Sequence, residues 1–223
     1  MASIYAQMTY DDVAAEAEKL CLTSLGGFHP MAQDQAPEGC QTLILLGPKE
    51  PAFWPHFQRS DEFLDGRPDP LDRWSTRILG SLAETLEATA LLPFGGPPYL
   101  PFYSWALKTN RTYMSPIKLL VHDQSGLFVS FRGALGFNER IEIPSSVGKS
   151  PCQECDAPCL STCPVDAFRD GNYDSLRCKT HIAGPDTQDC KNSGCAARRA
   201  CPISQTFGRL PDQSQFHMKA FLI

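Results

Sequence analysis

Cysteines are the residues of this chain best suited to chemistry, and eight of the ten lie between Cys152 and Cys201. One run reads Cys152-x2-Cys155-x3-Cys159-x3-Cys163-Pro164, and the other reads Cys178, then Cys190-x4-Cys195-x5-Cys201-Pro202. Closely spaced thiolates followed by Cys-Pro are typical of chains that wrap iron–sulfur cubes. In two-cluster ferredoxins the last cysteine of each run ligates the other cube. The spacing therefore predicts two [4Fe-4S] clusters with crossed ligation.

Counting ligands supports this interpretation, because crossed ligation uses each of the eight cysteines once. Cluster one is expected to take Cys152, Cys155, Cys159 and Cys201, and cluster two Cys163, Cys178, Cys190 and Cys195. Local ligation, with the first run closing one site by itself, is the alternative partition. Helices beginning at Pro164 and Pro202 would favour the crossed one, since proline suits the first helical position and carries the preceding cysteine away.

Two structural zinc sites are the competing interpretation, because zinc also takes four thiolates at short spacings. The Cys-Pro endings favour clusters, since zinc does not require them. A thioredoxin-like redox pair at Cys152 and Cys155 is weaker, as it lacks a βαβ context. Cys21 and Cys40 belong to no run and are interpreted as small buried hydrophobic residues.

Composition narrows the class of protein further. The chain has 223 residues, 42% hydrophobic and 20% charged, as in ordinary globular proteins. A net charge of −5 argues against nucleic acid as the main partner. The longest aliphatic run, Leu43 to Leu46, is too short to span a membrane, and no export signal is visible. We therefore expect a cytoplasmic protein, where clustered cysteines act as ligands rather than as disulfides.

The first two-thirds of the chain is expected to be mixed α/β. Thr9 is expected to cap a helix that runs to about Leu22, and residues 42–46 form a buried strand. Asp69 is expected to cap a second helix that starts at Pro70. Its buried face is expected to hold apolar residues at helical spacing: Leu71, Trp74, Ile78, Leu82 and Leu86. Residues 119–122 and 127–131 are predicted to form a hairpin. The linker at 144–151 divides a domain at 1–148 from one at 149–223.

An aromatic stretch follows the Pro/Gly-rich segment 93–99. Such residues usually pack in a core, yet apolar pockets are also where flat cofactors bind. Candidate cofactor-binding residues are therefore Tyr99, Phe102 and Trp105. No dinucleotide fingerprint, P-loop or nucleophile elbow is present in the sequence.

The cysteine-rich third resembles the double [4Fe-4S] ferredoxin domain of epoxyqueuosine reductases and reductive dehalogenases, which also place a lone cysteine, here Cys178, between the two runs. Segments 42–46, 69–72 and 121–133 look like segments, in the same order, of the cobalamin-processing (decyanating and dealkylating) family. This resemblance implies a flavin-reductase/nitroreductase-like α/β domain that binds base-off cobalamin, followed by a small ferredoxin-like domain. Residues 91–96 lack the acidic proton donor of epoxyqueuosine reductases, so that activity is not carried over.

Three functions are compatible with these residues. The first is an iron–sulfur protein whose two [4Fe-4S] clusters pass electrons to a site on the α/β domain. The second is a cobalamin-dependent reductase or cobalamin-processing enzyme, and the third is a zinc-stabilised interaction protein. The expected partners are an electron donor or acceptor protein and a small-molecule or corrinoid ligand, with no role for nucleic acid or membrane. Catalytic residues are not identifiable from the sequence.

Overall fold

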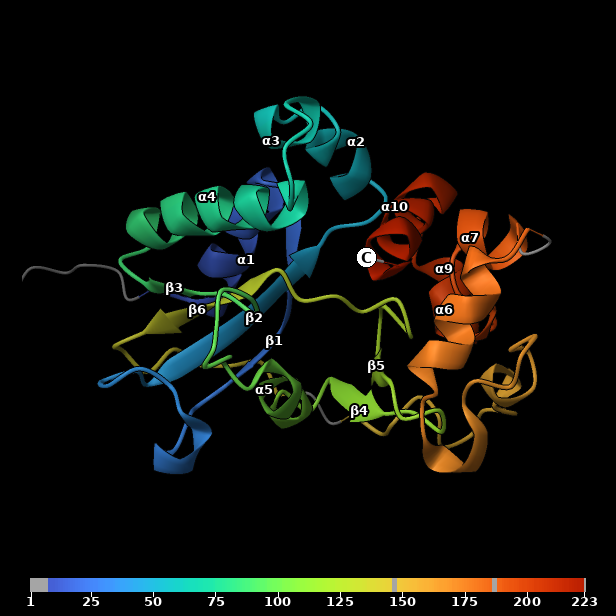
Figure 1. Ribbon diagram of the computed structural model, residues 1–223. Coiled ribbons are helices and arrows are strands. Elements are labelled where there is room, and N and C mark those ends of the chain that lie inside the picture. The colour runs from blue at the N-terminus through green and yellow to red at the C-terminus, as the bar shows by residue number, and fades with distance from the viewer. Residues whose placement is uncertain (1–7, 146–147, 186–187, 223) are drawn as a thin grey trace, which may run out of the picture. The chain divides into compact units, whose positions relative to one another are not determined.

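The computed structural model describes residues 8–145, 148–185 and 188–222 and is a mixed α/β protein (Figure 1). It divides into two compact units. Unit one comprises Met1–Asn110 and Ser130–Val147, and unit two comprises Arg111–Val129 and Gly148–Ile223. The division differs from the single boundary expected after residue 148, because residues 111–129 belong with the cysteine-rich part. The expected linker at 144–151 has no helix or strand in its described residues. Residues 146–147 lie outside the described residues.

Unit one is built on a four-stranded antiparallel sheet with the order β1-β2-β6-β3. Its strands are β1 (Leu22–Phe28), β2 (Thr42–Pro48), β3 (Thr89–Leu91) and β6 (Gly133–Phe137). Strand β2 is central and buried along its whole length, which confirms the strand expected at 42–46. A Cβ on Gly133 would lie 2.4 Å from Leu79 Cδ1, so glycine lets the covering helix approach β6 closely.

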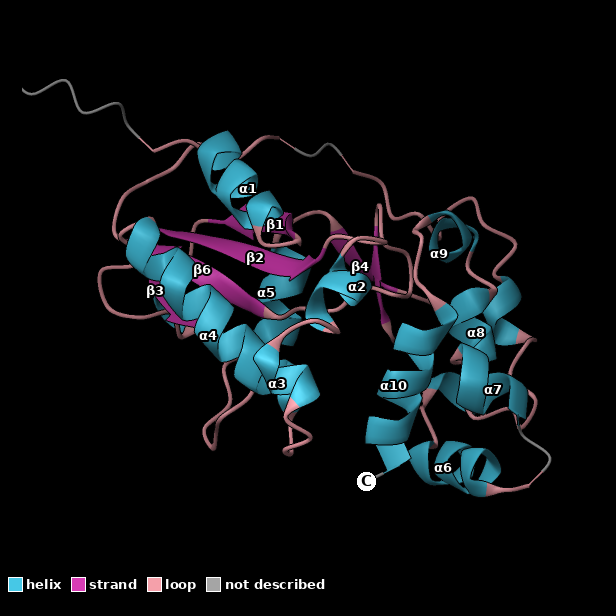
Figure 2. Ribbon diagram, turned by 90° about the horizontal axis from the view of Figure 1, so that it is seen from above, coloured by secondary structure: helices cyan, strands magenta, loops and turns pink. Residues whose placement is uncertain are grey.

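Three helices cover this sheet. Helices α1 (Tyr10–Lys19) and α4 (Pro70–Thr85) lie over one face, and α5 (Phe102–Lys108) lies on the other (Figure 2). The predicted start of α1 is confirmed, since Thr9 and Asp12 form a reciprocal capping box. The expected apolar face of α4 is buried at every predicted position. Short helices α2 (Phe53–Phe57) and α3 (Asp61–Leu64) precede α4, and α3 packs against it.

The start of α4 differs from the sequence prediction in one respect. Asp69 occupies the N-cap position, but its side chain makes no capping hydrogen bond. Its backbone is left-handed, with φ +52° and ψ +46°, whereas a side chain that caps a helix normally stands on extended backbone. Pro70 at the first helical position therefore marks the start without help from the Asp69 carboxylate.

Helix α5 is joined to the short 3-10 helix η1 (Ala32–Asp34) by two polar contacts. Trp105 Nε1 donates a hydrogen bond to the backbone oxygen of Asp34 at 2.7 Å, and Lys108 Nζ pairs with the Asp34 carboxylate. The hydrogen bond from Lys108 lowers the pKa of Asp34 below its usual range. Because Asp34 is buried, this pair matters to the stability of unit one.

Unit two contains a two-stranded hairpin and a set of short helices. The hairpin pairs β4 (Thr112–Met114) with β5 (Leu120–His122) in antiparallel register. The helices are η2 (Pro158–Leu160), η3 (Arg169–Gly171), α6 (Ser175–Ala183), α7 (Gln188–Ser193), α8 (Ala196–Arg199), α9 (Pro202–Thr206) and α10 (Pro211–Leu222). Helix α10 packs against α7 and α6. Within the described part of the chain, no helix is long and apolar enough to cross a membrane.

The hairpin expected between 119–122 and 127–131 is wrong. Strand β5 pairs with β4 instead, and on its other side makes only the isolated bridge between His122 and Gly126. The backbone explains the difference, because Gly126 has φ +56° and the N–H of Leu127 is bound to a side chain, Oγ of Ser204. Residues 127–131 therefore leave as irregular chain rather than as a strand.

Candidate functional site

Unit two gathers the eight clustered cysteines into two groups of four, and each group lines its own cavity. The first cysteine group consists of Cys152, Cys155, Cys159 and Cys201. The second cysteine group consists of Cys163, Cys178, Cys190 and Cys195. These are the two sets that crossed ligation predicts, and all ten cysteines of the chain are free thiols. Ligation of clusters by the two groups stays a prediction.

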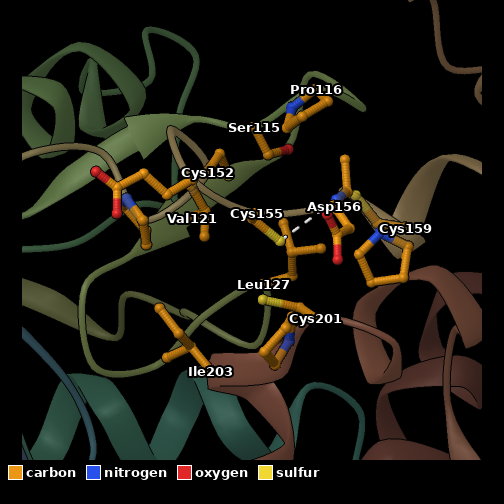
Figure 3. A pocket seen from close by; sticks show the side chains of 15 residues that line it. Ser115, Pro116, Val121, Leu127, Cys152, Cys155, Asp156, Cys159, Cys201 and Ile203 are labelled. Carbon is orange, nitrogen blue, oxygen red and sulfur yellow. Dashed lines mark hydrogen bonds between the residues drawn. The ribbon is translucent and has the colours of Figure 1, made fainter.

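The first cavity has a volume of about 460 Å³ and is drawn in Figure 3. Cys159 lies in η2, whereas Cys201 comes from the far end of the cysteine-rich stretch as the N-cap residue of α9. Pro202 is the first residue of that helix, as predicted. Its ring fits a position whose N–H has no partner within the helix, so α9 begins there and leads the chain away from Cys201.

Residues 111–129, which include the β4–β5 hairpin and are called the hairpin segment below, form part of the wall of the first cavity. The sequence alone did not predict this. Val121 and Leu127 line the cavity, and with Ile117 they belong to one buried cluster that includes Cys159 and Cys201. No local signal links these residues to cysteines at least thirty positions away, because the contact is long-range. These side chains give one side of the cavity an apolar surface.

Ser204 connects this wall to α9. Its Oγ accepts a hydrogen bond from the backbone N–H of Leu127 at 2.9 Å, and both residues are buried. Gly126 makes the approach possible, since a Cβ there would lie 2.5 Å from the Ser204 nitrogen and 2.6 Å from its Oγ. The position of Cys201, three residues before Ser204, therefore depends on a turn in the hairpin segment.

Ser115 adds a polar group to the wall of the first cavity. It is only 3% exposed, and its Oγ has no hydrogen-bond partner among the residues that the structure describes. Figure 3 shows the Ser115 side chain at the edge of the cavity, where its Oγ is closed off from solvent. The hydroxyl of Thr112, on β4, is also buried and without a partner in the described chain, but Thr112 does not line this cavity. A buried hydroxyl without a partner is costly, and unit two carries two of them on or beside the β4–β5 hairpin.

The second cavity is much narrower, about 20 Å³, and its other walls are largely apolar. Cys178 lies in α6, Cys190 in α7, and Cys195 is the N-cap residue of α8. Cys163 stands in irregular chain, and Pro164 begins a turn rather than the expected helix. The turn is closed by a hydrogen bond from the Asp166 N–H to the Cys163 carbonyl, at 3.1 Å. The chain therefore forms a turn after Cys163 and helix α9 after Cys201.

Peptide and side-chain donors reach several of these sulfur atoms. The N–H of Ala157 donates to Cys155 Sγ at 3.4 Å, drawn as a dashed line in Figure 3. The N–H of Ala167 donates to Cys163 Sγ at 3.2 Å. Tyr173 makes a side-chain hydrogen bond with Cys178. Donors of this kind stabilise negative charge on sulfur and are a common feature of cluster ligands.

Burial is the main influence on four of the thiols. It raises the pKa of Cys152, Cys159, Cys178 and Cys190, and neighbouring thiolates of the same group raise it further. The neighbours that act on Cys159 are Cys152, Cys201 and Cys155, which places these four sulfurs within electrostatic reach of one another. A bound cationic group would reverse this effect, because metal coordination deprotonates a thiol outright. Among the described residues, no group of three or more His, Cys, Asp or Glu side chains could hold a metal ion as it stands.

The candidate aromatic residues lie in unit one and do not form a common surface. Trp105 is fully buried and Phe102 is 6% exposed, with their ring centroids 5.0 Å apart, whereas Tyr99 is 64% exposed. The buried Trp105 ring already donates its N–H to Asp34, which gives it a structural role. Cofactor binding by Tyr99, Phe102 and Trp105 stays a prediction.

Cys21 and Cys40 are in unit one, apart from both cysteine groups. Each is partly rather than fully buried. Burial raises the pKa of Cys40, and its Sγ donates a hydrogen bond to the Thr42 carbonyl at 3.4 Å. Neither residue belongs to the first or the second cysteine group.

Comparison of the chain with protein-family models, with curated proteins and with solved structures found no match in any of the three.

Proposed function

We propose that unit two holds two [4Fe-4S] clusters, one on each cysteine group, and that the protein transfers single electrons between an external redox protein and a site on unit one. The observation that carries the proposal is the division of eight thiols into two complete sets of four, each lining its own cavity. Four cysteine thiolates are the ligand set of a [4Fe-4S] cube. A bound cluster supplies reversible one-electron storage.

The first cysteine group fits such a cofactor in chemistry and in space. Its cavity, at about 460 Å³, is lined by four thiols and by apolar side chains from the hairpin segment. Different residues would have different roles toward the cluster. The four thiols would bind it, and Val121 and Leu127 would exclude water from it. The Ala157 N–H donates a hydrogen bond to Cys155 Sγ. A dry, apolar shell and sulfur-directed donors are the features by which proteins set cluster potentials.

The second cysteine group fits in donor chemistry, while its space is tighter. Its cavity of about 20 Å³ is closed by apolar side chains that include Phe168 and Met218. A cube bound there requires those side chains to move outward. Ala167 and Tyr173 make hydrogen bonds to cysteine sulfurs of this group, as Ala157 does in the first group.

Two zinc ions are the competing occupants, since four thiolates also form a structural zinc site. Zinc would require the sulfurs to close around a single ion at about 2.3 Å each. That outcome would make the protein a zinc-stabilised interaction module without redox chemistry. The two readings differ in metal content, sulfide content and colour, so one preparation decides between them.

The test is reconstitution of the full chain with iron and sulfide under anaerobic conditions. About eight irons and eight acid-labile sulfides per chain, with brown colour, are expected if both cubes form. Two zinc ions per chain without sulfide would overturn the proposal. Cys21→Ser and Cys40→Ser serve as matched controls, because neither residue lies in a cysteine group, and both should keep the full iron content.

Cobalamin is a separate question, raised by the resemblance of segments 42–46, 69–72 and 121–133 to cobalamin-processing proteins. Addition of cobalamin to the reconstituted protein is the test. A shift of its absorption to the base-off form would make the cobalt the acceptor of electrons from unit two. Absence of binding in the high-micromolar range would leave an electron-transfer protein with another acceptor.

A further inference from the structure

We infer that Arg199 closes the loop between Cys190 and Cys195 and places a fixed positive charge beside the second cysteine group, and so raises the reduction potential of the cluster bound there. This inference rests on the proposed function and goes beyond it by assigning a role to a residue that is not a ligand. Arg199 acts through the two cysteines and is therefore a positioning residue. Its charge makes the reduced, more negative form of the cluster more stable.

The first argument is where the Arg199 side chain is bound. It comes from α8, whose N-cap residue is Cys195, and its Nε donates a hydrogen bond to the Gly194 carbonyl at 3.2 Å. Its Nη2 pairs with the carboxylate of Asp189 on α7. Asp189 and Gly194 directly precede Cys190 and Cys195 in the sequence. One guanidinium therefore holds both ends of the loop that carries these two thiols.

The second argument is the backbone of this loop. The Gly194 N–H donates to the Cys190 carbonyl at 3.1 Å. Gly194 has φ +87°, and a Cβ there would lie 2.8 Å from the Cβ of Ser214 on α10, so glycine is required at this turn. The carbonyl of Gly194 accepts from Arg199. The planar fork of a guanidinium suits this position, because it can bind a carbonyl and a carboxylate at the same time.

The third argument is the charge. Burial raises the pKa of the Cys190 thiol, the Asp189 carboxylate raises it further, and the Arg199 guanidinium lowers it. Both charges therefore reach the Cys190 sulfur, with opposite sign. Reduction adds negative charge to a cluster, so a nearby cation favours the reduced form and a nearby carboxylate favours the oxidised form.

The first cysteine group has no corresponding cation among the described residues that line its cavity. The charged side chains on that wall are the carboxylates of Glu154 and Asp156. Its cluster serves as an internal reference, because a change at Arg199 should leave its potential where it is in the wild type.

The experiment is a potentiometric titration of the reconstituted full chain, with dithionite as reductant and electron paramagnetic resonance as readout. Arg199→Gln should move one of the two potentials to a more negative value, by about threefold in the ratio of reduced to oxidised cluster, or about 28 mV for one electron. Asp189→Asn should move the same potential in the opposite direction. Both shifts should shrink at high ionic strength, since the two side chains are 34% and 69% exposed.

Two further variants separate charge from loop closure and from a general effect. Arg199→Lys keeps the charge and loses the planar fork, so its potential should stay near that of the wild type while iron retention by the second cysteine group falls. Arg111→Gln is the matched control for loss of a guanidinium. Arg111 also pairs with a carboxylate of unit two, that of Asp123, but it lines neither cavity. It should leave both potentials unchanged.

The outcomes separate the inference from the proposed function. A wild-type chain without iron and sulfide refutes the proposed function before any potential is measured. Full cluster content in Arg199→Gln with unchanged potentials, or a shift equal to that of Arg111→Gln, overturns the role of Arg199 alone. If Arg199→Gln does not retain the cluster, Asp189→Asn decides the question, since an unshifted or more negative potential in that variant also overturns the inference.

Discussion

Leu127 and Ser204 are joined by a hydrogen bond of 2.9 Å from backbone N–H to side-chain Oγ, across 77 positions of sequence. The bond connects the segment 111–129 to the first turn of α9, directly after Cys201. The hairpin segment therefore helps to position Cys201, although Cys201 lies in a different part of the chain. Ser204 is therefore expected to matter for cofactor binding although it lies outside the cysteine groups.

Ser204→Ala should destabilise unit two by about 1–3 kcal/mol, because it leaves the buried Leu127 N–H unpaired. Iron bound by the first cysteine group should fall with it. Denaturant unfolding of the metal-free protein and iron content after reconstitution measure the two effects. Ser161→Ala is the control, since Ser161 is exposed and its hydroxyl bonds only to a local carbonyl. Equal losses in both variants would contradict the role given to Ser204.

Gly126→Ala should be more damaging than its backbone conformation alone explains. A Cβ at this residue meets the Ser204 nitrogen at 2.5 Å, in addition to the strain of φ +56°. Gly66→Ala is the matched control, because Gly66 has φ +67° with nothing within 4 Å of the added Cβ. The control should lose about 1 kcal/mol from left-handed strain, and Gly126→Ala clearly more. Thermal unfolding of the two variants checks the difference.

Crossed ligation makes opposite predictions for the two Cys-Pro cysteines. Cys201→Ser should impair the cluster held with Cys152, Cys155 and Cys159, and Cys163→Ser should impair the one held with Cys178, Cys190 and Cys195. Each variant should keep about four irons in the undamaged site. Under local ligation the assignments would be exchanged. Potentiometric titration with Tyr173→Phe as a marker of the second cysteine group identifies which cluster remains.

Lys108→Met should destabilise unit one by about 1–2 kcal/mol at neutral pH, since it leaves the buried Asp34 carboxylate without its partner and Lys108 itself is one-third exposed. The pKa of Asp34 is lowered when folded. Its contribution is thus present above the unfolded pKa of about 3.9 and is lost as the pH falls through the lower folded value. The difference between variant and wild type should therefore shrink in acid. Unfolding curves at pH 7 and pH 3 measure it, and a constant difference would argue against the pair.

Asp69→Gly should raise stability slightly, by about 0.5–1 kcal/mol, because it relieves a left-handed residue that makes no capping hydrogen bond. Loss of an Asp that caps through its side chain would not stabilise the protein. A melting temperature that falls in Asp69→Gly would show that the carboxylate supports α4 after all.

Short spacings alone left two partitions of the cysteines open. The grouping seen in the two cavities could be predicted because a Cys-Pro ending is typical of a cysteine that belongs to the other set. Pro202 starts a helix as expected, yet Pro164 does not, since Cys163 closes a turn with Asp166 and the next α-helix starts only at Ser175. Proline permits a helix start without requiring one. The residues that follow decide.

The wall of the first cavity could not be predicted, for a different reason. Strand β5 pairs with β4, a strand of three residues without a recognisable sequence pattern. The N–H of Leu127 donates to Ser204 instead of to a neighbouring strand. The first pairing is local but leaves no signal in the sequence, and the second depends on a residue 77 positions further along the chain. Ser115 shows the same limit, because an unpaired hydroxyl is recognised only once its surroundings are known.

Unit two is formed by two separate stretches of the chain, and this limits how it can be transferred between genes. Residues 111–129 and 148–223 are separated by a strand of the other unit, and Tyr113 Oη donates to the Gly148 carbonyl at 2.8 Å where the second stretch begins. A recombination event that copied only the cysteine-rich stretch would leave Val121, Leu127 and Ser115 behind. The recombinant protein would contain all eight clustered cysteines but would lack one wall of the first cavity. A transfer of unit two to another protein would therefore have to carry residues 111–129 as well as the cysteine-rich stretch.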